Sequence, residues 1–308
     1  MMTLNPDKMH SNNTTRRKFL KDISKAAGSA MILASPISSF GSDQPAEWTV
    51  GQIMDLFMNE VPGGPLTPTV DTLKSGNRDM KVTGIVTTMF PTFEVIRKSI
   101  DLKANFIICH EPTYYGHQDS IDWLENDELY KAKSELLKKN NITIWRNHDH
   151  IHRHFPDGVK SGVITKLGWE NYWDPKSNQI VNIPEMTLKK LIDHVKQKLG
   201  IPTLRYSGYL SQPCRKILFN PGFNTGNIVI PVIAREKPDV VMGGEFHEWE
   251  AVEYIRDLQL SGQKTSLIIM GHSDSEEPGS AYMAEWLKEK VKGVNVTHMP
   301  AKNPLSFM

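Results

Sequence analysis

The sequence predicts an α/β fold built as two halves, each with a mostly parallel or mixed sheet, which face each other across a shared site. Apolar runs of strand length alternate with amphipathic segments of helix length along most of the chain, as in βαβ units. The alternation pauses at a loop with a proline turn near Pro184 and then restarts. We therefore expect an N-terminal α/β domain over residues 46–183 and a C-terminal α/β domain over residues 184–308.

The first half is expected to begin with a helix over residues 50–59, followed by a loop rich in proline and glycine. Strands are expected over residues 81–88, 105–109 and 142–146, and helices over residues 92–104 and 126–138. In the last of these helices, the spacing of Leu129, Ala132 and Leu136 predicts that they face the core. Strand and helix alternate as in a mostly parallel sheet.

The second half repeats this alternation. Strands are expected over residues 215–219, 239–242, 265–270 and 294–298, and helices over residues 187–199, 227–236 and 248–257. A further helix is expected to begin at Pro278, because proline is favoured in the first helical turn.

The first 41 residues match a twin-arginine (Tat) export signal. Arg16 and Arg17 stand in a Thr-Arg-Arg-Lys-Phe-Leu-Lys stretch, and a mildly apolar run over residues 26–34 follows. That run is too short and too rich in Gly, Ala and Ser to span a bilayer comfortably. We expect cleavage after Gly41, or alternatively after Ala34, and export by the Tat translocase to the periplasm or beyond, with no membrane attachment of the mature chain.

Charge and cysteine content narrow the classes of function. Without residues 1–41 the chain keeps 30 basic and 33 acidic residues, so its formal charge is −3. Neither nucleic acid nor an anionic membrane surface is favoured as a partner, and we expect a small-molecule substrate. Cys109 and Cys214 are the only cysteines, which is no disulfide framework. Because Cys109 stands beside His110, it is either a thiolate ligand or a small buried residue at a strand end.

Side chains that bind metals occur in three separate places, each directly after an apolar run. These places are His110-Glu111, the stretch over residues 148–154, and His272 with Glu276. Imidazole and carboxylate together suit a borderline transition metal. Because ligands of a parallel sheet gather beyond the carboxyl ends of its strands, we expect these places to form one metal site.

Some candidate residues are expected to act beside the metals. His148, His150 and His154 stand in a segment that we expect to be extended, of which at most one face can point at the metals. Among them His148 is the best outer partner or proton carrier. Glu245 and His247 are either acid/base or outer groups, or they cap the helix that follows.

These motifs resemble those of the NIF-three-like (NGG-one-interacting-factor-three-like) dinuclear metal-centre family. In that family a His-His-Pro triplet after a strand, a His-x-x-x-Asp segment and a Gly-His-x-x-x-Glu segment converge on two metals. The counterparts here are Cys109-His110-Glu111-Pro112, the segment from His148 to His152, and the segment from Gly271 to Glu276; Gly243-Gly244-Glu245 resembles the family's glycine-acid loop. The resemblance spans about residues 50–304 and keeps the order of the motifs.

Two positions depart from the family pattern in a compensating way. Glu111 stands where the second histidine is usual, and His152 stands where the aspartate is usual. The resemblance implies five ligands, three imidazoles and two carboxylates: His110, Glu111, His152, His272 and Glu276, with Asp149 as a rival to His152. Because the total is unchanged, we expect a site for two divalent transition-metal ions (Zn, Fe, Mn or Co) with altered bridging.

Two alternative functions are expected for such a site. The first is a metal-dependent hydrolase, in which a metal-activated water attacks a small phosphoryl or carbonyl substrate and Glu245, His247 or His148 carries the proton. The second is a non-catalytic protein whose metals hold a ligand or join the two halves. Members of the family are often labelled as resembling a GTP cyclohydrolase; no base-reading motif is visible here, so we do not carry that substrate over. The resemblance also implies a ring-shaped homo-oligomer, usually a hexamer.

Overall fold

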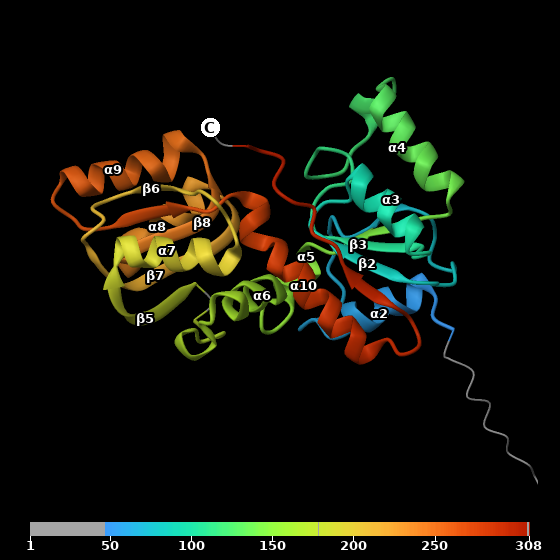
Figure 1. Ribbon diagram of the computed structural model, residues 1–308, viewed down its shortest axis with the longest axis horizontal. Helices are drawn as coiled ribbons and strands as arrows, with labels where there is room; N and C mark the ends of the chain where they lie inside the picture. The colour runs from blue at the N-terminus through green and yellow to red at the C-terminus, as the bar shows by residue number, and fades with distance from the viewer. Residues whose placement is uncertain (1–46, 178, 307) are drawn as a thin grey trace, which may run out of the picture. The chain divides into compact units, whose positions relative to one another are not determined.

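The computed structural model describes residues 47–177, 179–306 and 308, so the expected export signal lies outside the described residues. Residues 44–308 form one compact unit. The described part contains two five-stranded sheets with helices packed around them (Figure 1). In this part of the chain, no helix combines the length and the apolar character that crossing a membrane would require. The mixed α/β fold with two sheets agrees with the fold class that the sequence predicts.

The first sheet has the strand order β1-β4-β3-β2-β10. Its strands are β1 (Leu73–Ser75), β2 (Ile85–Thr88), β3 (Phe106–Cys109), β4 (Thr143–Arg146) and β10 (Val296–His298). Neighbouring strands are parallel except for β1, which runs antiparallel to β4. We expected residues 294–298 in the C-terminal half, but β10 pairs with β2, with Val296 opposite Ile85. The end of the chain thus returns to the first sheet.

Most helices of the first half begin at a polar cap residue next to them in the sequence. The helices are α2 (Val50–Met58), α3 (Phe93–Asp101), α4 (Glu128–Lys139), α5 (Asp149–Arg153) and α6 (Gly158–Leu167), with a 3-10 turn over Asp122–Leu124. The cap residues are Thr49 for α2, Thr92 for α3, Asp127 for α4 and Asp157 for α6. Thr49 and Gln52 form a capping box at the start of α2.

The predicted inner face of α4 is only partly right: Leu136 packs against the core, but Leu129 and Ala132 are exposed, and Lys133 and Leu137 are the buried residues. Leu137 and Lys133 determine which face of α4 is turned inward. Lys133 Nζ donates a hydrogen bond to the Thr113 carbonyl oxygen at 2.8 Å.

The second sheet has the order β5-β7-β8-β9-β6. Its strands are β5 (Ile180–Thr187), β6 (Arg205–Ser207), β7 (Pro213–Asn224), β8 (Val240–Phe246) and β9 (Ser266–Ile269). The expected loop at Pro184 is instead part of β5. The strand accommodates this proline because β5 is an edge strand whose register with β7 shifts between Asn182 and Met186.

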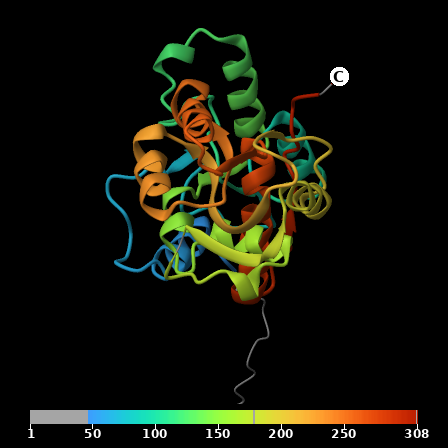
Figure 2. The same ribbon diagram turned by 90° about the vertical axis from the view of Figure 1, so that its left-hand side faces the viewer.

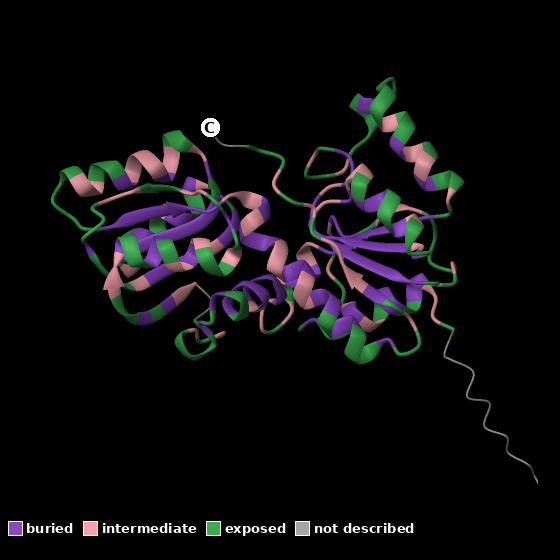
Figure 3. Ribbon diagram, in the orientation of Figure 1, coloured by how far each residue is buried: buried purple, intermediate pink, exposed green. Residues whose placement is uncertain are grey.

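Helices cover both faces of the second sheet (Figure 2). They are α7 (Leu188–Leu199) on one face, and α8 (Gly226–Glu236) and α9 (Glu253–Leu260) on the other; shorter pieces are a 3-10 turn over Glu170–Tyr172 and a π-helical turn over Glu248–Val252. Alternate residues of β7 pack to opposite faces: Ile217 lies in the cluster with α7, and Leu218 in the cluster with α8 and α9. The central strands of both sheets are largely buried, whereas the edge strands β1 and β6 are half-buried or exposed (Figure 3).

A long helix, α10 (His272–Lys290), connects the two sheets. It begins six residues before the expected start at Pro278, which lies inside the helix. Glycines let α10 and α6 approach closely, because a Cβ at Gly162 would overlap the carbonyl oxygen of Pro278, and a Cβ at Gly279 would overlap the backbone of Val159. The C-terminal part of α10 packs into the core of the first sheet through Met283, Ala284 and Leu287.

Candidate metal centre

Three segments that are distant in the sequence meet at the carboxyl end of the first sheet. β3 ends at Cys109, and His110 and Glu111 follow it directly. Beyond the end of β4, His148 is the N-cap residue of α5 and His152 lies within that helix. The third segment is the first part of α10, which carries His272 and Glu276.

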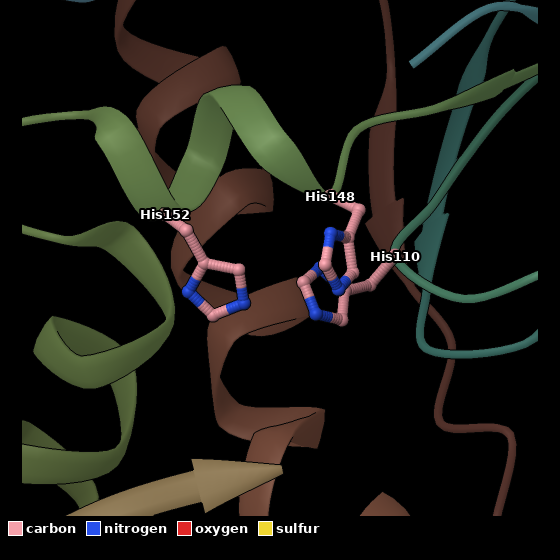
Figure 4. A group of neighbouring side chains, drawn as sticks. All are labelled: His110, His148 and His152. Carbon is pink, nitrogen blue, oxygen red and sulfur yellow. The ribbon is translucent and has the colours of Figure 1, made fainter. Parts of the chain in front are cut away.

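The rings of three histidines lie against one another (Figure 4). His110 and His148 stack with their ring centroids 4.7 Å apart. His152 meets both rings at an angle, with centroid distances of 5.1 Å to each. His148 and His152 are four residues apart, and helix α5 places such residues on one face.

Two carboxylates, Glu111 and Glu276, stand among the imidazoles. His272 Nε2 lies 3.3 Å from Glu111 Oε1 and 3.2 Å from Glu276 Oε2. The Nε2 atoms of His110 and His152 lie 3.6 Å and 3.8 Å from Glu276 oxygens, and that of His148 lies 3.9 Å from Glu111 Oε1. Four imidazole Nε2 atoms thus converge on the same pair of acids.

The other ring nitrogen of each histidine has an acceptor on the outer side of the group. The Nδ1 acceptors are the Asn147 carbonyl oxygen at 3.3 Å for His110, Asp149 at 2.9 Å for His148, Asp157 at 3.1 Å for His152, and Glu245 at 2.9 Å for His272. When Nδ1–H donates outward, the lone pair of Nε2 points inward. Metal-binding histidines are oriented by outer partners in this way.

The donor set fits divalent transition metals. Two overlapping groups place one ligand atom per residue within 4.8 Å of one another: His110 with His148 and His152, and His110 with Glu111 and Glu276. Within the described residues, His110 Nε2 and Glu276 Oε2 are buried and have no hydrogen-bond partner. A buried polar atom without a partner is costly, and a cation between these atoms would remove that cost.

Burial and the neighbouring charges shift the pKa values of Glu276 and His272 in opposite directions, and the neighbouring charges have the larger effect. Burial alone would raise the pKa of Glu276, but the imidazoles around it, His110 above all, hold that pKa well below its usual value. Burial alone would lower the pKa of His272, but Glu111 and Glu276 raise it to about 11. The centre therefore favours positive charge between its carboxylates, which a proton or a metal cation can provide.

His148, at the N-cap of α5, and His152, within the helix, differ in protonation. Burial and the neighbouring imidazoles of His110 and His152 lower the pKa of His148 to about 4, so this ring is neutral at pH 7. Burial opposes the charged form of His152 as well, but Asp157 outweighs it and raises the pKa to about 9. A neutral imidazole is the form that binds a metal, so His148 is already in the ligating state.

The first turns of α10 pack closely against strands β7 and β8 of the second sheet. A Cβ at Gly222, whose φ is +74°, would overlap the Glu276 carboxylate, and a Cβ at Gly244 would overlap Ser275 Oγ. Ser275 Oγ accepts a hydrogen bond from the Gly222 N–H at 2.9 Å, and the Gly271 N–H donates to the Gly244 carbonyl oxygen at 3.0 Å. These close approaches hold His272 and Glu276 against the ends of β7 and β8.

A cavity of about 1240 Å³ opens onto the carboxylates and imidazoles. Aromatic side chains line its walls: Phe90, Phe93, Tyr115 and Phe223. Tyr115 and Phe223 keep about half of their surface exposed, 53% and 42%. The cavity also contains Lys302, Asn220 and Asn303, so it offers both apolar surface and hydrogen-bonding groups to a small molecule.

Residues 71–304, more than half of the chain, match the model of the Duf34/NIF3 (NGG1p interacting factor 3) family. The chain belongs to the NIF3 family. It is 25% identical over 252 residues to a Clostridium perfringens protein named GTP cyclohydrolase 1 type 2 homolog, covering 77% of this chain and 90% of that protein. Its fold is similar to that of a hypothetical protein from Staphylococcus aureus, with a TM-score of 0.67, 17% identity, and coverage of 85% and 100% of the two chains. A Bacillus cereus protein related to NIF3 gives a TM-score of 0.66, 18% identity, and coverage of 85% and 99%.

The five ligands that the NIF3 resemblance implies all face the same centre: His110, Glu111, His152, His272 and Glu276. The rival to His152 does not. Asp149 Oδ2 instead accepts hydrogen bonds from Thr69 Oγ1 at 2.8 Å and from the Val70 N–H at 3.1 Å.

His148 is a sixth inward-facing residue, which the sequence analysis placed beside the metals rather than at them. We expected residues 148–154 to be extended, but residues 149–153 form helix α5. The helix starts here because Asp71 accepts hydrogen bonds from the backbone N–H groups of His148, Asp149 and His150 at 2.7, 3.0 and 2.7 Å. The i, i+4 spacing of His148 and His152 was the available signal.

His150 has a structural role in the fold and does not face the centre. Its Nδ1 lies 2.6 Å from Asp71 Oδ2, and its Nε2 accepts a hydrogen bond from the Leu66 N–H at 3.0 Å. Because Nε2 is an acceptor, the proton is on Nδ1 and the ring is neutral. Both nitrogens are thus used within the fold, and the buried ring anchors α5.

Glu245 and His247, the other expected catalytic residues, both line the cavity. Glu245 is engaged with His272 Nδ1, which makes it an outer partner of that ring. His247 stacks on Trp249 with centroids 4.5 Å apart, and its Nδ1 lies 3.3 Å from Glu250 Oε1. Cys109 points elsewhere: its thiol faces the Trp145 carbonyl oxygen, and burial raises its pKa to about 12, which disfavours a thiolate ligand.

Proposed function

We propose that this NIF3-family protein is an exported two-metal protein that acts as a metal-dependent hydrolase on a small phosphoryl or carbonyl substrate. One observation carries the proposal: four imidazole Nε2 atoms converge on two buried carboxylates while every corresponding Nδ1 has an outer acceptor. Such a donor set suits Zn, Fe, Mn or Co. When bound, two such ions would lower the pKa of a water molecule and take up charge on the attacked oxygen.

The chain's own residues would hold the metals, bind the substrate and carry a proton. His110, His152, His272, Glu111 and Glu276 are the proposed ligands, and the inward ring of His148 is a sixth donor. Phe223 and Tyr115 would bind the apolar part of a substrate at the cavity walls. Among the proposed proton carriers, His247 fits best, because Glu245 is bound to His272 and His148 faces inward. Glu250 would hold the His247 ring in place from its Nδ1 side.

The relatives named GTP cyclohydrolase 1 type 2 homolog do not set the proposed substrate. A nucleoside triphosphate is an unsuitable regular substrate for a protein exported from the cytoplasm. We therefore propose the reaction class without a specific substrate.

The metal-loaded protein would test the hydrolase. We would count metals per chain by elemental analysis and assay the loaded protein against phosphomonoesters, phosphodiesters and cyclic amides. His272→Ala is expected to lose both metal and activity, whereas His194→Ala, on α7 and hydrogen-bonded to the Leu167 carbonyl oxygen, serves as a matched histidine control. Hydrolysis that survives in His272→Ala would contradict the proposal, and a count of one metal would contradict the two-metal centre.

A second candidate function is a protein that binds a ligand through its metals without turnover. The observation in its favour is that two of the proposed proton carriers are engaged by other side chains: Glu245 lies 2.9 Å from His272 Nδ1, and His247 Nδ1 lies 3.3 Å from Glu250 Oε1. In the same assay, two bound metals with no hydrolysis of any substrate class would support this function.

Export and assembly complete the proposal. The twin-arginine segment lies outside the described residues, so we propose export by the Tat translocase to the periplasm from the sequence pattern. Replacing Arg16 and Arg17 by lysine should leave the protein in the cytoplasm, as cell fractionation would show. We also propose a homo-oligomer, a hexamer by family resemblance, which light scattering of the purified protein would test.

A further inference from the structure

Arg146, the last residue of β4, has a fully buried side chain beside the proposed metal centre. Its Nε donates to the His110 carbonyl oxygen at 3.1 Å, and its Nη1 donates to the His117 carbonyl oxygen. Its Nη2 donates to Glu111 Oε2 at 3.2 Å. One guanidinium thus contacts both ends of the segment that carries His110 and Glu111.

Further buried charges hold Arg146 itself. Asp119 Oδ2 lies 3.6 Å from Arg146 Nη1 and 3.3 Å from Lys74 Nζ. Lys74 Nζ also donates to the Val70 carbonyl oxygen at 2.9 Å. The side chains of Lys74, Asp119, Arg146 and Glu111 are at most 8% exposed, and two positive charges balance two negative ones.

The two oxygens of Glu111 therefore face different partners. Oε2 faces Arg146, whereas Oε1 lies 3.3 Å from His272 Nε2 and 3.9 Å from His148 Nε2, on the side of the proposed metals. A charge-assisted hydrogen bond to a buried guanidinium holds one carboxylate oxygen in place and withdraws part of its charge. The inward oxygen is the only one left for a cation.

We propose that Arg146 is a positioning residue that makes Glu111 a one-oxygen ligand with a nearly neutralised charge, and that Asp119 and Lys74 hold Arg146 for this task. The inference rests on the proposed two-metal centre. Glu111 with Arg146 then contributes about the charge of a neutral imidazole, so a carboxylate can occupy this position without adding negative charge to the centre. Buried charges of this kind act as a unit, because removal of one partner leaves the next uncompensated.

A double-mutant cycle would test the coupling. We would measure Zn²⁺ stoichiometry and affinity for the full chain and for Glu111→Gln, Arg146→Met and the double variant. Arg146→Met should weaken Zn²⁺ binding roughly 10- to 100-fold, as removal of an outer partner typically does. The double variant should lose no more than the weaker-binding single variant. If instead the two losses multiply, Glu111 and Arg146 act independently and the proposal is wrong.

Two further measurements separate positioning from general damage. With Co²⁺ bound, Arg146→Met should change the visible absorption spectrum, because Glu111 is then free to offer both oxygens. Arg146→Lys, which keeps the charge but loses the fork, should fold and restore part of the affinity. Arg215→Met, which replaces an exposed arginine on β7, is the matched control and should change neither the Co²⁺ spectrum nor the metal affinity. An unchanged Co²⁺ spectrum in folded Arg146→Met would overturn the proposal.

Unfolding of the metal-free variants keeps this test distinct from that of the proposed function. The charge network predicts that Arg146→Met lowers the melting temperature of metal-free protein and that Glu111→Gln lessens this loss, since it removes an unpaired buried charge. If wild-type protein takes up no metal, the proposed function fails and the ligand role of Glu111 fails with it. If it takes up two metals but the cycle shows no coupling, only the Arg146 proposal fails.

Discussion

The first sheet supplies inward-facing side chains at its strand ends, whereas the second sheet supplies none of the six inward-facing residues. His110 and Glu111 follow β3 and are buried, at 5% and 6% exposure. The second sheet instead contributes glycines that seat α10 and one outer partner, Glu245, whose side chain is 51% exposed. In the proposed centre, the first half would hold the metals, while the second half positions α10 and shapes the cavity. Four predictions test this division of labour, beginning with the largest expected effect.

Replacement of Glu276 tests the helix on which both halves depend. Glu276→Gln removes the carboxylate that faces His110, His152 and His272, so we expect loss of both metals. Elemental analysis after loading and desalting measures this. Glu289→Gln, at an exposed position on the same helix, is the control. Retention of two metals by Glu276→Gln would show that α10 is not part of the centre.

Replacement of Asp71 tests how much the contacts that hold α5 stabilise the first half. Asp71→Asn weakens the cap of α5 and the buried contact with His150, so unfolding free energy should fall by about 2–3 kcal/mol. Chemical denaturation of metal-free protein measures it. Asp193→Asn breaks an exposed pair with Lys189 and should cost less than about 1 kcal/mol. Equal losses in the two variants would mean that α5 is held by other contacts.

Lys133, on helix α4 of the first half, makes the stability of the fold depend on pH. Burial lowers the pKa of its ammonium group to about 8, below the value of 10.5 that it has when exposed. Between these values the unfolded chain binds more protons than the folded chain, so stability rises with pH from about 8 to 10.5. Lys133→Met should flatten this rise, which amounts to roughly 2–3 kcal/mol in the unfolding free energy measured by chemical denaturation across that range. A rise of unchanged slope would contradict the assignment to Lys133.

Glu245 tests the second half and has the smallest expected effect. Glu245→Gln weakens the outer contact to His272 Nδ1, and because the carboxylate is half exposed we expect about a tenfold loss of Zn²⁺ affinity. Competition with a chelator measures it, and Glu248→Gln, at an exposed position two residues beyond the end of β8, is the control. A loss as large as that of Glu276→Gln would show that the second sheet holds the metals as firmly as the first.

Much of the fold and most of the centre were predictable from the sequence. The alternation of strands and helices identified β3, β4 and β9 to within one residue at each end, and it located β2, β7 and β8 with one end displaced by four or five residues. The placement of His110 directly after an apolar run identified one end of the centre, because parallel strands bring their carboxyl ends to one edge. The local sequence predicts these strands because a buried strand requires a run of apolar side chains.

The remaining features depend on contacts between distant residues. Helix α5 forms where an extended segment was expected, because Asp71, 78 residues before Asp149, accepts its first N–H groups. β10 joins the first sheet because α10 carries the chain back across the molecule, and no local pattern encodes that direction.

By itself, the sequence determined where most of the buried strands and longer helices lie and which residue types gather at strand ends, since both follow from the spacing of apolar and ionisable side chains. The tertiary structure alone decided that His148 faces inward and that Arg146 meets Glu111. Such choices depend on which buried charges and donors come together when the sheets and α10 pack, and pairing across long separations leaves no trace in the local sequence.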